Sequence, residues 1–341
     1  MTSAWPAPVA APAPDGGGAY LRSYLQPFQT WLDAGDVTEI IVNQPGELWV
    51  ERVGVPGMTR HDAPDIDAAL LQRLAFQIAR ISHQGVSRES PLLSATLGEG
   101  ARVQIIAPPA TRAHLALAIR KHVLADLSLD QYTQGGGFAA ITAPGEEGER
   151  AVQAHLRQLL DAHDYCAFLK AAVAARRTIL LSGGTSSGKT TLLNALLKEI
   201  PARERVIVIE DTPEIRLAHA NALGLVAVPG DLGEARVSID DLMRASLRMR
   251  PDRLLVGELR GPEAITFLRA INTGHPGSLA TIHASSPEGA FEQIALMCLQ
   301  AELGLSRDAS IPLARSLIDI VVQLRLIDGQ RVVSSIEMTK G

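Results

Sequence analysis

A glycine-rich loop between an apolar strand and an apolar helix constrains this chain more than any other feature. Residues 183–190 have the sequence Gly-Gly-Thr-Ser-Ser-Gly-Lys-Thr, which fits the pattern GxxxxGK[ST]. The glycines let successive backbone N–H groups converge on phosphate oxygens, and the helix adds the positive end of its dipole. The apolar run 178–181 precedes the loop, and the helix that follows has one stripe of Leu192, Leu193, Leu196, Leu197 and Ile200. This context predicts a phosphate site rather than a glycine-rich turn without a ligand.

The loop supplies most of the predicted cofactor contacts. Lys189 is expected to reach the β- and γ-phosphates of ATP, and the hydroxyl of Thr190 to ligate Mg²⁺. The predicted ATP-binding residues of the loop are Gly183, Gly184, Thr185, Ser186, Ser187, Gly188, Lys189, Thr190 and Thr191.

The residues around the loop predict a mostly parallel α/β sheet. Short apolar runs at 206–209 and 253–256 are typical of strands buried on both faces, and 279–282 is expected to form one more core strand. Helical patterns at about 151–175 and 189–199 alternate with these strands.

Three acidic side chains and one histidine follow the predicted strands. Glu210 and Glu214 come after one strand, Glu258 ends the next, and His283 follows a later one. Because strand carboxyl ends flank the phosphate site in such sheets, we predict that Glu258 positions or activates water, with Glu210 and Glu214 in support. His283 is expected to sense the γ-phosphate. The plainer alternatives are surface acids at strand ends and a structural histidine.

Basic residues also cluster near the second acidic strand. Arg260 follows Glu258 directly, and a stretch before the strand carries Arg244, Arg248, Arg250 and Arg253. These arginines are either a solvated helix face or phosphate contacts, made within one subunit or from a neighbour.

The first half of the chain predicts a separate, smaller domain. Strand patterns occur at 37–42, 47–51, 102–106 and 115–120, and a helical pattern occurs at 66–84. We expect a disordered Pro/Ala/Gly-rich tail at 1–19, an α+β domain at 20–125, a linker at 126–150 and the ATP-binding domain at 151–341.

Composition excludes several classes of protein. The net charge of −5 disfavours a nucleic-acid binder, and the two cysteines, Cys166 and Cys298, form no metal-type pair. The N-terminus lacks the pattern of a secretory signal, and no segment approaches the roughly 20 apolar residues of a membrane span. We therefore expect a cytoplasmic protein.

Four segments in order resemble the motifs of the secretion-ATPase superfamily. The loop 183–190 resembles the Walker A motif, 209–214 (IEDTPE) the Asp-box, and 256–260 (VGELR) the Walker B motif. The residues GHPG at 274–277 and TIHA at 281–284 resemble the His-box. Within the superfamily, the chain resembles the VirB-type traffic ATPases of type IV secretion and conjugation systems.

The N-terminal half carries the same resemblance. The segments 37–43, 91–100, 102–109 and 117–121 look like the N-terminal domain of that family, so the resemblance covers about residues 20–340. It implies a RecA-like P-loop domain after the smaller domain, and a hexameric ring with nucleotide held between the two domains. It also implies that Arg102 and Arg120 contact the nucleotide. For Arg260 we predict the same contact from its position after Glu258.

The resemblance further implies where the protein works and with what. Such ATPases act at the cytoplasmic face of the inner membrane, associate with it peripherally, and energise substrate transfer or pilus assembly. The implied partners are inner-membrane secretion-system subunits and further copies of the chain, without sequence-specific nucleic acid.

Three other functions compete with this interpretation. A pilus assembly or retraction ATPase shares the motifs, although assembly-type relatives often carry a four-cysteine zinc element that two isolated cysteines cannot form. An aromatic content of 4% disfavours a nucleic-acid motor. A nucleotide switch remains open, although the chain has no Asn-Lys-x-Asp segment to select guanine.

Overall fold

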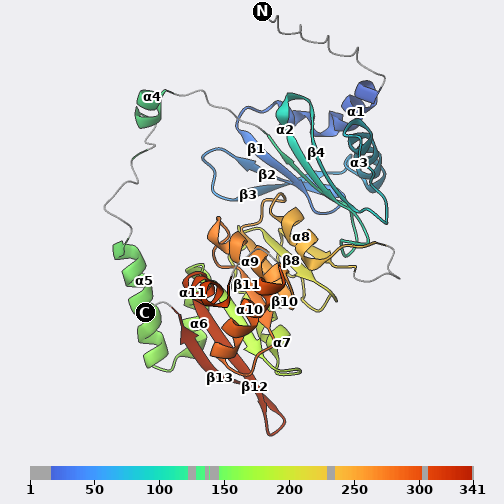
Figure 1. Cartoon of the computed structure of the whole chain (residues 1–341). Coiled ribbons are helices and arrows are strands. Elements are labelled where there is room, and N and C mark those ends of the chain that lie inside the picture. Colours follow the sequence, from blue (N-terminus) through green and yellow to red (C-terminus); the bar gives the residue numbers. More distant parts are fainter. Residues whose placement is uncertain are drawn as a thin grey trace, which may run out of the picture.

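The chain forms two sheets, one in each half. The structure, a computed structural model, describes residues 17–121, 128–134, 138, 146–228, 235–301 and 306–339. Figure 1 shows a sheet flanked by helices in the upper part and a second helix-flanked sheet in the lower part. The prediction of an α/β protein with a smaller α+β part before a mostly parallel sheet is confirmed.

The first sheet is antiparallel, with its strands in the order β3-β2-β1-β6-β5-β4. Its strands are β1 (Val37–Val42), β2 (Gly46–Arg52), β3 (Met58–Ala63), β4 (Leu92–Thr96), β5 (Arg102–Ile106) and β6 (Ala116–Arg120). The helical elements beside it are α1 (Gly17–Leu25), η1 (Gln26–Phe28), α2 (Gln29–Asp33) and α3 (Ala68–Ile81).

Alternation along β1 and β2 assigns the two faces of this sheet. Ile40 and Leu48 belong to the core beneath α3, whose residues Leu71 and Leu74 pack there. Side chains of the opposite parity, such as Ile41 and Trp49, belong to the core of the C-terminal half. The first sheet is therefore buried on both sides, by its own helices and by the second half of the chain.

The second sheet has the order β13-β12-β7-β11-β10-β8-β9 and is parallel except for β13 at one edge. Its strands are β7 (Ile179–Gly183), β8 (Val206–Glu210), β9 (Ala222–Val226), β10 (Arg253–Leu259), β11 (Leu279–Ile282), β12 (Ile320–Ile327) and β13 (Gln330–Met338). The helices are α4 (Leu129–Gln134), α5 (Glu146–Asp161), α6 (Tyr165–Ala174), α7 (Lys189–Leu197), α8 (Ile239–Ser246), α9 (Glu263–Asn272), α10 (Pro287–Gln300) and α11 (Arg307–Leu317).

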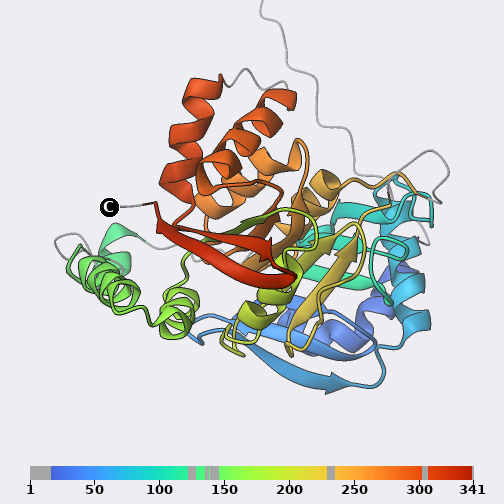
Figure 2. The same cartoon turned by 90° about the horizontal axis from the view of Figure 1, so that it is seen from below.

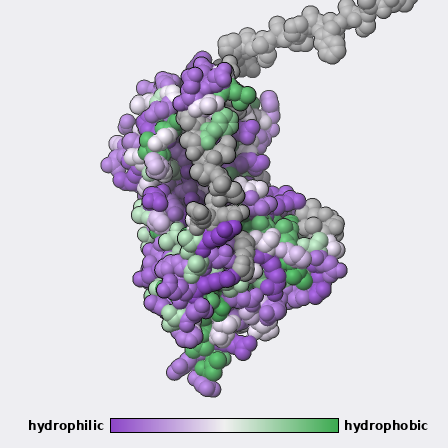
Figure 3. Space-filling view, turned by 90° about the vertical axis from the view of Figure 1, so that its left-hand side faces the viewer, coloured by the Kyte–Doolittle hydropathy of each residue, from purple (hydrophilic) through white to green (hydrophobic). Residues whose placement is uncertain are grey.

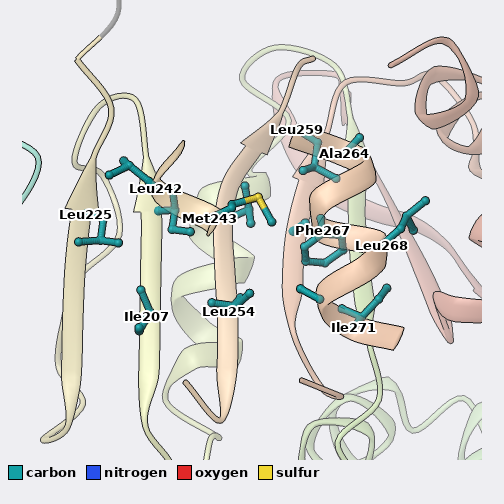
Figure 4. Packing of buried hydrophobic residues seen from close by; sticks show 14 of the residues in the cluster. Ile207, Leu225, Leu242, Met243, Leu254, Leu259, Ala264, Phe267, Leu268 and Ile271 are labelled. Atoms are coloured by element: carbon teal, nitrogen blue, oxygen red, sulfur yellow. The ribbon is translucent and has the colours of Figure 1, made fainter. Parts of the chain in front are cut away.

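Helices cover both faces of the second sheet. On β8, Ile207 and Ile209 enter one core, while Val206 and Val208 enter the other. Figure 4 shows the first of these cores, where α8 and α9 bring Met243 and other apolar side chains against the strands. Figure 2 shows α10 and α11 on one side of the β12–β13 hairpin and α5 and α6 on the other. Continuous apolar strands follow from this two-sided burial.

One predicted helix is wrong. The segment 151–175 forms two helices, because His163 takes a left-handed φ of 58° and Asp164 caps α6 by accepting a 3.0 Å hydrogen bond from the Ala167 N–H. The first of them begins at Glu146, within the segment predicted as a linker. Residues 1–16 of the predicted tail lie outside the described residues, and α1 begins at Gly17. In the part of the chain that the structure describes, no helix is long and apolar enough to cross a bilayer.

Glu39 on β1 predicts a pH-dependent stability. It is 5% exposed, and burial raises its pKa to about 7 from 4.5, against the opposing charge of Arg120. The unfolded chain ionises first, so the stability contributed by the neutral carboxyl is complete below the unfolded pKa and is lost as pH rises toward 7. We expect Glu39→Gln to raise the free energy of unfolding by about 2 kcal/mol at about pH 8, and by little at about pH 5.

Chemical denaturation at the two pH values measures this difference. Asp62→Asn changes an exposed carboxylate of the same sheet and serves as the control. An equal effect of Glu39→Gln at both pH values would contradict the assignment.

Candidate active site

The phosphate loop lies between β7 and α7. β7 pairs in parallel with β11 and β12, and all of it is buried. Gly188 has a φ of 97° and Ser186 a φ of 57°, so the chain turns tightly before the helix begins. A side chain at position 183 would lie 2.5 Å from the Ser187 hydroxyl and 2.7 Å from the Leu324 carbonyl, so glycine is required there. The first N–H groups of α7 have no intrahelical partners and form an anion site at the loop.

The ammonium of Lys189 is held inside the loop. Its Nζ donates to the carbonyls of Gly183 at 2.8 Å and Gly184 at 3.1 Å, and the residue is 8% exposed. Burial lowers the pKa of Lys189, and the charge of Glu258 opposes that shift. A phosphate is a stronger partner than two neutral carbonyls, so nucleotide binding is expected to draw the ammonium out of these bonds.

Glu258 lies at the end of β10, where its pairing with β11 becomes irregular. Oε1 lies 3.0 Å from Nε2 of His283, and Oε2 accepts a 2.8 Å hydrogen bond from Arg260. Arg260 also pairs with Asp211. The hydrogen bond to Glu258 raises the pKa of Arg260 above its ordinary value. The carboxylate is thus held between a permanent cation and an imidazole.

His283 has two competing neighbours at one nitrogen. Its Nε2 lies 3.0 Å from Oε1 of Glu258 and 3.4 Å from Nζ of Lys189. A neutral imidazole nitrogen either carries a hydrogen and donates to Glu258, or is bare and accepts from Lys189. If Lys189 moves toward a phosphate, Nε2 of His283 loses that neighbour and is expected to hydrogen-bond to Glu258. The role of His283 as a phosphate sensor stays a prediction. The geometry supports it, because movement of Lys189 toward a phosphate changes the hydrogen bonding of His283.

Thr190 faces the second acidic group. Its hydroxyl donates to Oε2 of Glu214 at 3.0 Å, so its lone pairs remain for a cation beside the loop. Mg²⁺ prefers oxygen ligands and keeps several waters when it is bound with substrate phosphates. A hydroxyl oriented by Glu214, with the Asp211 carboxylate lining the same cavity, fits that requirement.

Glu210 ends β8 and shapes the loop that carries Glu214. It is 2% exposed, and its Oε1 accepts from the backbone N–H groups of Glu214 and Ile215, at 2.8 Å each. Its Oε2 accepts from Arg112 of the N-terminal half. With both oxygens engaged, Glu210 is placed to support the site rather than to take a proton.

These groups surround one cavity of about 430 Å³, within the size range of small-molecule sites. Its lining also includes residues to which the sequence analysis assigned no role. Thr281 on β11 donates to the Gly257 carbonyl at 2.6 Å, and Arg331 on β13 donates to the Ser186 carbonyl at 3.1 Å. Thr281 lies on β11, two residues before His283. Because side chains alternate along a strand, this spacing predicts that both face the same side of the sheet. No local motif marks Arg331.

The other predicted arginines lie elsewhere. Arg102 and Arg120 are exposed and face each other across β5 and β6, outside the set that lines the cavity. Within the basic stretch, Arg253 is fully buried and paired with Glu204, and Arg250 pairs with Glu51 of the N-terminal half. Neither a solvated face nor a phosphate contact describes Arg253, because its guanidinium is buried and bonded to Glu204 and to the Gly277 carbonyl, which precede β8 and β11.

Comparison with known proteins gives matches over most of the chain. Residues 149–337 match the family described as Type II/IV secretion system protein. A type IV secretion system protein VirB11 of Bartonella henselae is 36% identical over 331 residues, which cover 93% of this chain and 92% of the relative. The chain belongs to the VirB11 family.

A second relative and a solved structure extend this result. A type IV secretion system protein PtlH homolog of Bordetella bronchiseptica is 41% identical over 315 residues, 90% of this chain and 91% of the relative. The crystal structure of the VirB11 ATPase from the Brucella suis type IV secretion system, in complex with sulphate, matches with a TM-score of 0.86 and 36% identity over 94% of this chain and 95% of that one. The predicted resemblance to VirB-type secretion ATPases is confirmed, and the chain is an ATP-hydrolysing enzyme of that family.

Proposed function

We propose that this chain hydrolyses ATP with Mg²⁺ as one subunit of a hexameric ring, which energises substrate transfer or pilus assembly in a type IV secretion system. The observation that carries the proposal is the phosphate loop facing Glu258 across one cavity, in a chain of the VirB11 family. We further propose that the ring works in the cytoplasm, bound peripherally to the inner membrane through secretion-system subunits. The net charge of −5 supports the absence of a sequence-specific nucleic-acid partner.

The chemistry follows from the positions of the side chains. The N–H groups of the loop cradle the β- and γ-phosphates, and Lys189 exchanges its carbonyl partners for phosphate oxygens. Mg²⁺ held at Thr190 neutralises phosphate charge when bound. Glu258 accepts the proton of the water that attacks the γ-phosphorus, while the bond to the β–γ bridging oxygen breaks. Arg260 keeps Glu258 oriented through the hydrogen bond between them.

The β12–β13 hairpin supports an oligomer. Its tip exposes the apolar side chains of Leu326, Ile327 and Val333, at 53%, 48% and 44%. Figure 3 shows apolar surface on this protrusion at the bottom of the molecule. Apolar side chains gathered on an edge hairpin are a common mark of contact between chains. We propose that the tip packs against a neighbouring subunit of the ring.

The proposed ring also offers a role for Arg102 and Arg120. The family resemblance motivates their contact with nucleotide, although neither is among the residues that line the chain's own cavity. We propose that they approach the nucleotide held by another subunit.

Steady-state phosphate release from ATP, measured against protein concentration, tests the proposed function. An assembled ATPase is expected to gain specific activity as concentration rises, and Glu258→Gln is expected to lower that activity by at least about 100-fold. Low, concentration-independent turnover with ATP still bound would contradict the proposed motor.

A further inference from the structure

The N-terminal half reaches the ATPase site through the connection between β5 and β6. Thr111 forms an isolated antiparallel bridge with Leu225 of β9. Next to it, the Arg112 N–H donates to the Gly224 carbonyl at 3.2 Å, and the Val226 N–H donates to the Ala110 carbonyl at 2.9 Å. This short segment therefore extends the second sheet beyond β9, its edge strand.

The side chain of Arg112 continues inward from this bridge. Its Nη2 pairs with Oε2 of Glu210, and its Nη1 donates to the Ile215 carbonyl at 2.7 Å. The approach requires the small residue at position 224, because a Cβ there would lie 2.7 Å from both Cδ and Nε of Arg112. Glu210 is almost completely buried, and within the described part of the chain its ion-pair partner is the guanidinium of Arg112, which offsets the cost of burying the charge.

Glu210 connects Arg112 to the turn whose Glu214 side chain contacts the phosphate loop. Its other oxygen binds the N–H groups of Glu214 and Ile215, which sets the turn after β8. The turn aims the Glu214 carboxylate at the hydroxyl of Thr190, 3.0 Å away. An unbroken series of polar contacts thus joins the N-terminal half to the threonine that we propose as the Mg²⁺ ligand.

We propose that Arg112 is a positioning residue for Mg²⁺-nucleotide binding: it holds Glu210, and through the turn 210–215 it orients Glu214 and the Thr190 hydroxyl. The inference rests on the proposed role of Thr190. Other polar contacts between the halves, such as Glu51 with Arg250 and Asn43 with Arg205, do not touch this turn. We therefore expect the effect of Mg²⁺ on nucleotide affinity to depend on Arg112, and not on the docking of the two halves in general.

The test compares nucleotide affinity with and without the metal. A fluorescent N-methylanthraniloyl ADP is titrated with the full-length protein in EDTA and again in excess Mg²⁺. In Arg112→Ala the affinity in EDTA is expected to stay within about twofold of wild type, while the affinity in Mg²⁺ falls about tenfold. Arg112→Lys keeps a charge near Glu210 and is expected to recover part of the loss.

The matched control is Glu51→Ala, which breaks another contact between the halves at a side chain of similar exposure, 22% against 21% for Arg112. It is expected to keep the full gain in affinity from Mg²⁺. A general loss of fold would lower both affinities together, and a thermal melt without nucleotide identifies it. If Arg112→Ala does not fold, Gly224→Ala is the substitute: its Cβ would lie 2.7 Å from the Arg112 side chain and from that of Leu217, with both charged groups intact. It is expected to give the same selective loss.

Two results would overturn the inference while leaving the proposed function intact. One is an unchanged gain from Mg²⁺ in Arg112→Ala or in its substitute Gly224→Ala. The other is an equal loss in Glu51→Ala. A wild-type protein whose nucleotide affinity ignores Mg²⁺ would contradict the proposed function itself, and the inference with it.

Discussion

Glu258→Gln is expected to lower the turnover number for ATP by about 10²- to 10⁴-fold, the range of a lost general base. Glutamine has the size of glutamate and retains an oxygen that accepts from Arg260, so the shape of the site is preserved. It cannot take the proton of the attacking water. Nucleotide affinity is therefore expected to change by no more than a few fold, because the phosphates are held by the loop and Lys189 and not by this carboxylate.

Two measurements separate these effects. Single-turnover phosphate release reports the chemical step, and equilibrium titration with fluorescent nucleotide reports binding. Glu292→Gln alters a partly exposed carboxylate on α10, paired with Arg307, and serves as the control with unchanged activity. Turnover by Glu258→Gln at the wild-type rate would exclude Glu258 as the base. Loss of nucleotide affinity would instead indicate that its charge organises Arg260 and His283.

The phosphate loop, its strand and its helix could be predicted from sequence because their determinants are local. A side chain at position 183 would clash with Ser187, only four residues away, although also with the distant Leu324 carbonyl. The apolar strand and helix on either side of the loop need no distant partner to be recognised. The acidic residues 210 and 258 could be placed for a related reason. In a parallel sheet, all strands run in the same direction, so their carboxyl ends lie side by side. Groups just after the strands therefore gather at that end of the sheet.

The break between α5 and α6 depends on backbone conformation. Apolar periodicity continues across residues 162–164, so it predicts one helix. His163 nevertheless adopts a left-handed conformation, and the Asp164 side chain caps the next helix. The His-Asp pair was the available signal, since aspartate favours the N-cap and histidine tolerates positive φ better than most residues.

The contacts of Arg112 and Arg331 depend on tertiary structure alone. Arg112 is 98 residues from Glu210, and Arg331 is 145 residues from Ser186. Neither arginine stands in a motif, and one belongs to a connection between strands while the other opens an edge strand. Such contacts follow from how the two halves and the sheet edges meet, which local patterns do not encode.

Lys189→Ala is expected to abolish nucleotide-dependent stabilisation and to lower turnover by at least about 10²-fold, the lower end of the range for losing one donor that stabilises transition-state charge. In the folded chain the ammonium is buried, its pKa is lowered by that burial, and its hydrogen bonds go to two loop carbonyls. Removing it relieves the cost of burying a charge but frees those carbonyls. The melting temperature without nucleotide should therefore shift little.

The ligand-induced shift distinguishes a phosphate-binding lysine from a structural one. A ligand stabilises the fold by an amount that grows with the ratio of its concentration to its Kd, so wild type should melt at a higher temperature with a non-hydrolysable ATP analogue and Mg²⁺. Lys189→Ala should show no such rise, whereas Lys170→Ala, an exposed lysine paired with Glu199 on the same half, should match wild type. If the ligand raised the melting temperature of Lys189→Ala as much as that of wild type, the assignment of the phosphate site to this loop would be wrong. A lower melting temperature without nucleotide would assign the lysine to holding the loop together.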